Sequence, residues 1–371
     1  MVPNRFGNDG PSVSAPSRAV KELRQSRYPH RVVARVTVAD VAKAAGVSIT
    51  TVSHSLSGKG RVDASTRERV RAVAAELGYV PSRAARNLAL GRSDTIGLLL
   101  PQLTTMPLEE LLGFDWYGRV AVAASQAALH HGRALLALPG MQSRAHLESF
   151  GLEGLIVLDP VLDDPRLELL RGLPTRTVLV GQDPSGEFGP TVAIDTAEGT
   201  RLLLDHCWER GARRIAMISP DLAWSATADA REAYESWCAE HAMEPTLRVA
   251  PVASAQSRPD LSSAAKQTAL DLLCAPERPD ALIGMLEDFG HGIVLAAREL
   301  QLNVPGDLLI AQDIDDAVAA AFGITALDLN VHTQLDIAMG MLIADEPLPA
   351  DEVRLVSATL VSRESTNGLH R

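Results

Sequence analysis

Seven short apolar runs, beginning at Thr95, constrain the fold of this chain more than any other feature of its sequence. They read TIGLLLP, RALLALP, GLIVLDP, RTVLVG, RRIAMIS, DALIGML and DLLIAQD, and each is bounded by Gly, Pro or Asp. Strands without polar alternation that alternate with helices are typical of a parallel sheet covered on both faces. Because residues 94–371 are too many for one such sheet, we expect two doubly wound α/β lobes, with ligand contacts at the carboxyl ends of their strands.

A different pattern lies upstream, in residues 36–81. Two short stripes of apolar residues with helical spacing flank a Gly-Val-Ser turn at residues 46–48. The first stripe consists of Val38, Val41, Ala42 and Ala45, and the second of Val52 and Leu56. Gly46 can take the positive φ that turns the chain, and Ser48 can cap the second helix. The sequence therefore predicts a helix, a turn and a helix, although residues 46–56 alone fit an ordinary helical hairpin in any core equally well.

A third helix is expected to follow the loop SGKGRVDAS. Ser65 and Glu68 predict a capping box at its start, and Gly78 is placed to end it. Its outer face carries basic side chains, namely Arg67, Arg69 and Arg71. Residues 36–81 are therefore expected to form a small, basic, all-α domain.

Charge is distributed unevenly along the 371 residues. Residues 1–32 hold six Lys/Arg against two Asp/Glu, and residues 33–92 hold ten against four, whereas residues 93–371 hold 19 against 40. A basic end joined to an acidic body indicates a module that binds a polyanion on a carrier that nucleic acid would repel.

Two segments flank the predicted helical domain. Residues 1–35 are rich in Pro, Ser, Gly and Arg without periodicity, so we expect a disordered basic tail. Residues 82–93 form a hinge and linker, in which a helix of about nine residues would be marginal in water without a partner surface.

Motifs for catalysis or for a cofactor are missing from the sequence. The three cysteines, Cys207, Cys238 and Cys274, are far apart and outside any CxxC spacing, which favours neither disulfides nor a zinc site. No phosphate-binding Gly-rich loop, GxSxG or HExxH occurs. We therefore expect no enzyme, metal or cofactor. The start lacks an apolar signal region and no 18-residue apolar run follows, so the expected location is cytoplasmic, with no membrane partner.

The segments VTVADVAKAAGVSITTVSHSLSG and VDASTRERVRAVAAELGYVPSRAARNLA together resemble the LacI/GalR family of bacterial transcription regulators, without a gap from Thr37 to about Leu90. The body is similar in IDTAEGTRLLLDHCWERGARRIAMIS, PDALIGMLEDFGHG, AARELQLNVPGDLLI and VSRES. The resemblance implies a repressor that binds a pseudo-palindromic operator in double-stranded DNA as a homodimer. It also implies a body like a periplasmic sugar-binding protein, with a small-molecule effector between the lobes and chain crossings near Asp195 and Asp328.

The resemblance also assigns contacts with DNA. The second helix would enter the major groove, with Ile49, Thr50 and His54 facing bases. Residues near phosphates would be Thr37, Ser48, Thr51, Ser53 and Thr66. In the hinge, Leu88 would wedge open the minor groove, with Arg83 and Arg86 at phosphates or the groove floor. Many family members carry Arg where this chain has His54, so its base preference cannot be copied from relatives.

The effector site departs from the family pattern. The family commonly uses an Arg, an Asn-Asp pair and an Asp. Here Arg231 is present, but its spacing to Tyr234 is shorter by one than usual in the family. Leu286 and Glu287 replace the pair, and Ile314 stands at the Asp position. The candidate contacts are Trp116, Tyr117, Trp224, Arg231, Glu287, Asp313 and Asp315. Two readings stay open at this point, because these acids and Asp288 fit solvated loop positions equally well and the aromatics fit core anchors. The alternative function is a small-molecule-binding protein of the periplasmic type without regulatory DNA binding, which would lack the basic end.

Overall fold

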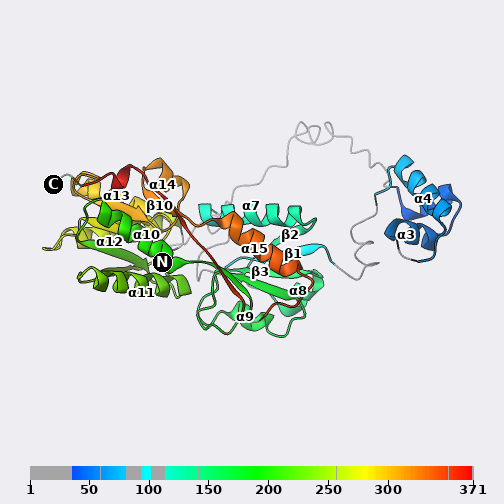
Figure 1. Ribbon diagram of the computed structural model, residues 1–371, viewed down its shortest axis with the longest axis horizontal. Coiled ribbons are helices and arrows are strands. Elements are labelled where there is room, and N and C mark those ends of the chain that lie inside the picture. The colour runs from blue at the N-terminus through cyan, green and yellow to red at the C-terminus, as the bar shows by residue number, and fades with distance from the viewer. Residues whose placement is uncertain are drawn as a thin grey trace, which may run out of the picture. The chain divides into compact units, whose positions relative to one another are not determined.

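The computed structural model describes residues 36–58, 60–80, 93–101, 113–140, 142–255, 257–349 and 351–369. They fall into two compact units, residues 1–91 and 92–371 (Figure 1). The predicted tail, residues 1–35, and the predicted hinge helix within 82–90 lie outside the described residues.

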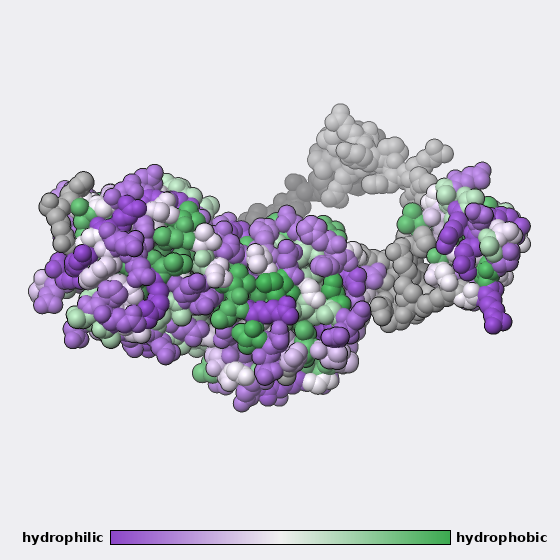
Figure 2. Space-filling model, in the orientation of Figure 1, coloured by the Kyte–Doolittle hydropathy of each residue, from purple (hydrophilic) through white to green (hydrophobic). Residues whose placement is uncertain are grey.

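The described residues of the first unit contain three helices: α2 (Val38–Ala45), α3 (Ile49–Ser57) and α4 (Ala64–Glu76). Their shared core consists of Val41, Ala42, Ala45, Val52, Val70 and Ala74. The turn is as predicted, because Gly46 has φ 65° and the Ser48 hydroxyl accepts the Thr51 amide at 3.1 Å. Figure 2 shows a mostly polar surface around this small core.

The predicted cap of the third helix is wrong. The N-cap of α4 is Asp63, whose carboxylate accepts the amides of Ser65 at 3.2 Å and Thr66 at 2.9 Å, so Ser65 and Glu68 do not form a capping box. A carboxylate just before the helix reaches two free amides at once and is favoured there by the helix dipole. The predicted stop at Gly78 is confirmed by its φ of 64°.

Two six-stranded sheets build the second unit, as predicted. The order in lobe 1 is β11-β5-β4-β3-β1-β2, from β1 (Thr95–Leu99), β2 (Ala134–Leu138), β3 (Gly154–Leu158), β4 (Arg176–Val180), β5 (Thr191–Ile194) and β11 (Val353–Val356). The order in lobe 2 is β12-β10-β9-β8-β6-β7, from β6 (Ile215–Pro220), β7 (Thr246–Ala250), β8 (Ala281–Gly284), β9 (Leu309–Gln312), β10 (Thr325–Asp328) and β12 (Thr359–Val361). All paired strands are parallel except β12, which runs antiparallel to β10.

Both faces of each sheet are covered by helices. In lobe 1, α7 (Asp115–His130) and α15 (Val331–Ile343) lie on one face, with α8 (Arg144–Ser149) and α9 (Pro165–Leu170) on the other (Figure 1). Side chains of β3 accordingly alternate, since Ile156 packs in one buried cluster and Val157 in another. In lobe 2 the helices are α10 (Thr196–Glu209), α11 (Ser225–Glu240), α12 (Arg258–Leu273), α13 (Phe289–Glu299), α14 (Ala317–Ala321) and the 3-10 turn η1 (Glu364–Thr366).

The chain crosses between the lobes at the two predicted places. It leaves lobe 1 at Asp195, between β5 and α10, and returns at Asp328, between β10 and α15. A further crossing joins β11 to β12. Among the described residues, no helix is long and apolar enough to cross a membrane.

Candidate functional site

The start of α3 faces outward. Ile49 is 53% exposed, and Thr50 beside it is also exposed. Val52, one turn on, is fully buried in the three-helix core. The core thus fixes α3 while its first turn faces outward.

His54 lies on α3, and the loop that follows the helix restricts its ring. Its ring is half-buried and packs against Gly60, since a Cβ added to Gly60 would stand 2.6 Å from the His54 Nδ1 atom. Gly60 has φ 78°, which favours glycine in any case. The loop after α3 therefore fixes the orientation of the His54 ring.

The polar residues predicted at phosphates have different surroundings. Thr37, Ser48 and Ser53 are exposed, whereas Thr51 and Thr66 are half-buried. The Thr66 amide is taken by Asp63, whose own pKa is lowered to about 2 by hydrogen bonds from Thr66 and Ser65. A permanently charged carboxylate at this helix start disfavours a phosphate at Thr66.

A cavity of about 180 Å³ lies between the two lobes of the body. It is lined by segments that follow β3, β4 and β5 in lobe 1 and β6, β8, β9 and β10 in lobe 2. Five of the seven predicted effector residues line it, namely Trp116, Tyr117, Trp224, Glu287 and Asp313. The carboxyl ends of the strands thus meet at one site, the usual ligand position in doubly wound sheets.

Glu287 joins the lobes across this site. Its carboxylate, between β8 and α13, accepts the amides of Asp115 at 2.9 Å and Trp116 at 3.2 Å, at the start of α7. Only 1% of Glu287 is exposed, and burial raises its pKa to about 7, although these amides and Arg258 act in the opposite direction. The reading of Glu287 as a solvated loop acid is therefore wrong.

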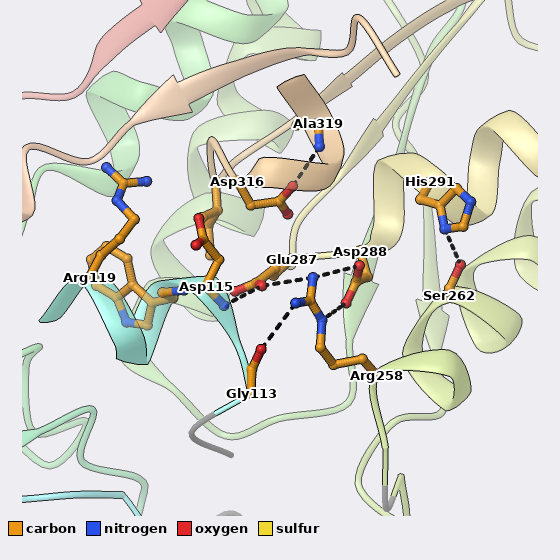
Figure 3. Close-up of polar contacts among 12 residues, drawn as sticks. Gly113, Asp115, Arg119, Arg258, Ser262, Glu287, Asp288, His291, Asp316 and Ala319 are labelled. Atoms are coloured by element: carbon orange, nitrogen blue, oxygen red, sulfur yellow. Dashed lines mark hydrogen bonds and ion pairs between the residues drawn. The ribbon is translucent and has the colours of Figure 1, made fainter. Parts of the chain in front are cut away.

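Arg258 completes the contact, as Figure 3 shows. Its guanidinium donates to both carboxylate oxygens of Asp288, at 2.7 and 3.0 Å, and to the Gly113 carbonyl at 3.1 Å, and it lies 3.1 Å from Glu287. Asp288 is 4% exposed, so it too is no solvated loop acid. A buried acid pair is tolerated here because one guanidinium and helix amides compensate it.

Asp313 differs from Glu287 in lacking such compensation. It follows β9, its Oδ1 atom is buried, and that atom has no hydrogen-bond partner within the described part of the chain. Burial, together with nearby Asp316 and Glu287, raises its pKa to about 8. An acid in this state is a candidate for contact with a ligand.

Two predicted effector residues lie elsewhere. Asp315 is not among the described residues that line the cavity, because its carboxylate pairs with Arg363 at 2.7 Å. Arg231 is exposed and also absent from the described lining, since α11 turns this position to solvent while Tyr234 on the same helix is fully buried. The spacing that differs from the family pattern here corresponds to this loss of the Arg from the site.

The aromatic residues fit both readings that the sequence left open. Tyr117 is buried and meets Phe114 edge to face at 6.3 Å, so it is a core anchor that also lines the cavity. Burial and the neighbouring Asp159 raise the pKa of Tyr117 well above its usual value. The buried Trp224 Nε1 atom has no hydrogen-bond partner in the described part of the chain, so it can donate into the cavity.

Sequence reasoning missed several residues of this site. Asp159, directly after β3, lines the cavity with its pKa raised by burial, and Thr200 on α10 lines it with an unpartnered hydroxyl. Asp159 directly follows the apolar part of the run GLIVLDP, so its place at a strand end could be predicted from the sequence. Thr200 carried no signal, because only the return of α10 toward the cavity places it there.

Comparison with protein families gives two matches. Residues 37–82 match the family described as bacterial regulatory proteins, lacI family, and residues 204–366 match a periplasmic binding protein-like domain.

Similar curated proteins are transcription regulators. The HTH-type transcriptional regulator RafR of Escherichia coli is 30% identical over 270 residues, covering 71% of this chain and 76% of RafR. Catabolite control protein A of Staphylococcus xylosus is 25% identical over 282 residues, covering 74% and 81%.

Two solved structures share the fold. The lac repressor dimer bound to operator and the anti-inducer ONPF has a TM-score of 0.71 at 20% identity, covering 90% of this chain and 99% of that one. The complex of the transcriptional regulator CelR with cellobiose has a TM-score of 0.64 at 22% identity, covering 89% and 100%.

Proposed function

Because the chain belongs to the LacI family of bacterial regulatory proteins, we propose that it represses transcription as a homodimer on a pseudo-palindromic operator, under control of a small molecule in the interlobe cavity. Membership makes it a DNA-binding transcription regulator with a periplasmic-binding-protein-like body, and not an enzyme. A binding protein without regulatory DNA binding would lack the match at residues 37–82. A chromosomal target requires action in the cytoplasm.

The outward first turn of α3 is the observation that carries the DNA-binding part. In the major groove, Ile49 contacts a thymine methyl and Thr50 forms hydrogen bonds to a base edge. Thr37, Ser48, Thr51 and Ser53 hold phosphates, with a weaker case for Thr66. In the hinge, Leu88 opens the minor groove of operator DNA, with Arg83 and Arg86 at phosphates or the groove floor.

A selection from random duplexes with the full-length protein tests this assignment. It should yield a pseudo-palindrome, whose two half-sites report the dimer. His54→Arg should shift one base per half-site toward guanine, because Arg binds guanine through two hydrogen bonds, worth about 1–3 kcal/mol of discrimination. An unchanged base profile would mean that His54 faces away from the bases.

Exposed apolar residues support a dimer surface on lobe 1. Among the described large apolar side chains that are exposed, five belong to this lobe and two to lobe 2; the five are Val122, Leu129, Leu162, Val353 and Leu355. Figure 2 shows hydrophobic residues gathered over lobe 1 on the visible face. Leu129 on α7 is 72% exposed, so Leu129→Asp should weaken self-association without loss of the fold. Sedimentation of the parent protein and the Leu129→Asp variant at equal concentration measures the change in self-association.

The interlobe cavity supports control by a small molecule. A ligand that prefers one arrangement of the lobes would shift the population of that arrangement, and with it the spacing of two DNA-binding units in a dimer. CelR was solved in complex with cellobiose, so a bound small molecule has a precedent among proteins with this fold. Measuring operator affinity by fluorescence anisotropy, with and without a bound ligand, tests this control.

A further inference from the structure

The wall of the interlobe cavity is largely apolar. Side chains from both lobes form it, including Phe114, Leu222, Val252, Leu261, Met285 and Ile314. Its volume of about 180 Å³ is below the roughly 300–1,000 Å³ of pockets for drug-sized ligands. A single ring with a short side chain fits this space better than a disaccharide does.

The polar groups of the cavity are strongly unbalanced. Five carboxyl groups line it, from Asp159, Asp195, Asp229, Glu287 and Asp313, whereas no Lys, Arg or His is found among the described lining residues. Some possible donors are already used, since Ser225 donates to the Gln182 carbonyl and Gln334 donates to the Leu329 carbonyl. The cavity therefore offers many acceptors and few donors.

Basic side chains close to the site are bound to other acids. Arg258 pairs with Asp288 and Glu287, Arg363 with Asp315, and Arg119 with Asp328. Within the described residues, these pairs leave Asp313 without a cation of its own. A positive charge at Asp313 would have to come from a ligand.

Unpartnered polar atoms mark where a ligand would bind. The Asp313 Oδ1 atom is a buried acceptor without a donor in the described part of the chain. Across the same cavity, the Thr200 hydroxyl, on a residue only 1% exposed, and the Trp224 N–H are also without partners there. Buried polar groups left unpaired cost free energy, so these atoms are sites for hydrogen bonds with a bound molecule.

A protonated amine supplies the positive charge that Asp313 lacks, and a neutral sugar does not. An ammonium presents three N–H donors and no acceptor, whereas each sugar hydroxyl presents a donor together with two acceptor lone pairs. We propose that the effector is a primary amine on a small apolar body, with its ammonium at Asp313 and its ring between Trp116 and Trp224. The assignment rests on the proposed role of the cavity as the effector site.

Calorimetry on the full-length protein tests the ligand class. The amine probes are phenethylamine, tryptamine and cyclohexylmethylamine. Each is compared with the alcohol that has a hydroxyl in place of the amino group, and cellobiose is tested as the sugar. At least one amine should bind roughly 10- to 100-fold more tightly than its alcohol, as expected for one charge-assisted hydrogen bond in a buried site. Equal affinities within every pair, or binding of cellobiose alone, would overturn the proposal.

The pH dependence of amine affinity shows which carboxylate binds the ammonium. Asp313 must lose its proton to pair with the ammonium, so amine affinity should rise from about pH 6 to about pH 8.5. The other titratable groups that face Asp313 are Glu287 and Asp316 beside it and Asp159, Asp195, Asp229 and Tyr117 around the cavity. Asp313→Asn should remove both the rise and the preference for amine over alcohol, whereas Asp336→Asn, at an exposed position of α15 outside the described lining, should keep both. A rise and a preference that survive in Asp313→Asn would overturn the assignment to Asp313.

Two measurements separate this inference from the proposed function. Melting at about pH 5, where Asp313 is protonated, should be alike for Asp313→Asn and the parent and confirms the fold of the variant. If amines bind through Asp313 but operator affinity does not change, the ligand class stands and the proposed control fails. If cellobiose instead changes operator affinity and no amine binds, the proposed control stands and the ligand class is wrong.

Discussion

The helix–turn–helix unit and the two-lobed body are stabilised by contacts of very different range. In the unit, the polar contacts at the helix starts join residues at most three apart, as in Thr37 with Asp40 and Ser48 with Thr51. In the body, Glu287 reaches the amide of Asp115, 172 positions away, and Arg119 reaches the Asp315 carbonyl, 196 positions away.

This difference has consequences for the functional groups of the two regions. The proposed DNA contacts are exposed and stand on a small core, so changing one should alter binding with little effect on folding. The polar groups at the cavity have buried atoms, and Glu287 holds the lobes together, so changing one of them should alter stability as well as binding. Truncation and point substitution can test that contrast.

The largest expected effect is the complete loss of operator binding from a fragment of residues 94–371. The body holds the excess of acidic residues and should be repelled by DNA, whereas residues 33–92 hold ten Lys/Arg against four Asp/Glu. Anisotropy titrations at several salt concentrations measure this loss. For the full chain, the logarithm of the operator binding constant should fall linearly with the logarithm of the salt concentration. A fragment that binds as well as the full chain would move DNA affinity into the body.

Among single substitutions at the cavity, Glu287→Ala should cause the largest loss of stability. It removes the acceptor of two α7 amides and leaves Arg258 with one partner fewer in a buried site. Breaking a buried charged contact typically costs about 3–5 kcal/mol, and chemical denaturation of the body measures the change.

Glu148→Ala is the matched control. Glu148 pairs with Arg144 four residues before it, and both side chains are about half exposed (51%). Such a surface pair contributes about 0.3–0.5 kcal/mol. Similar losses for the two variants would mean that burial and sequence separation do not decide the effect.

Asp313→Asn should raise the stability of the ligand-free protein at about pH 8, because its carboxyl group has a raised pKa in the folded state. The pKa is about 8 when the protein is folded, against an ordinary value of 3.8, so the folded protein keeps a proton that the unfolded chain releases. The free energy of unfolding of the parent therefore falls as pH rises from about 4 to about 8. We expect a gain of about 2 kcal/mol at pH 8, less than the full shift implies because the side chain is partly exposed.

Denaturation of both proteins at several pH values measures this gain. Glu287 titrates in an overlapping window, so the difference between the two proteins measures Asp313 together with its coupling to Glu287. Equal stability at pH 8 would show that the Asp313 carboxylate is well solvated in the folded body, and it would weaken the contrast between buried and exposed functional groups.

The same contrast explains what could be predicted from the sequence. The turn at Gly46, the cap at Ser48 and the strand ends at Asp159 and Asp313 follow from local patterns, because neighbouring residues decide them. The two lobes and both crossings were also predictable, the crossings through resemblance to the family. Local reasoning failed at α4, where the Asp63 carboxylate accepts the amides of Ser65 and Thr66 and also the Ser65 hydroxyl, so the helix starts before Ser65 can cap it.

The partners of the buried acids could not be predicted. In the sequence, Glu287 and Asp288 look like ordinary acidic loop residues. Only the packing of α7 and α12 around them provides the α7 amides that bind Glu287 and the Arg258 guanidinium that binds Asp288. Arg231 fits the family pattern in type but faces solvent, because a one-residue difference in spacing rotates a helical position by about 100°. Contacts between distant segments decide such cases, and one sequence does not record them.

Ser48→Ala should have the smallest effect, and it tests the local side of the comparison. The Ser48 hydroxyl accepts the Thr51 amide at the start of α3 while the helix is held by Val52 in the core. Loss of an N-cap typically costs about 1 kcal/mol, so the helix–turn–helix should melt at a lower temperature while the body is unchanged. Ser57→Ala, at the exposed last position of α3, is the control and should change little. Because Ser48 is also a proposed phosphate contact, its variant should lose operator affinity evenly across base sequences. A loss confined to particular bases would instead mean that the cap sets how α3 sits in the groove.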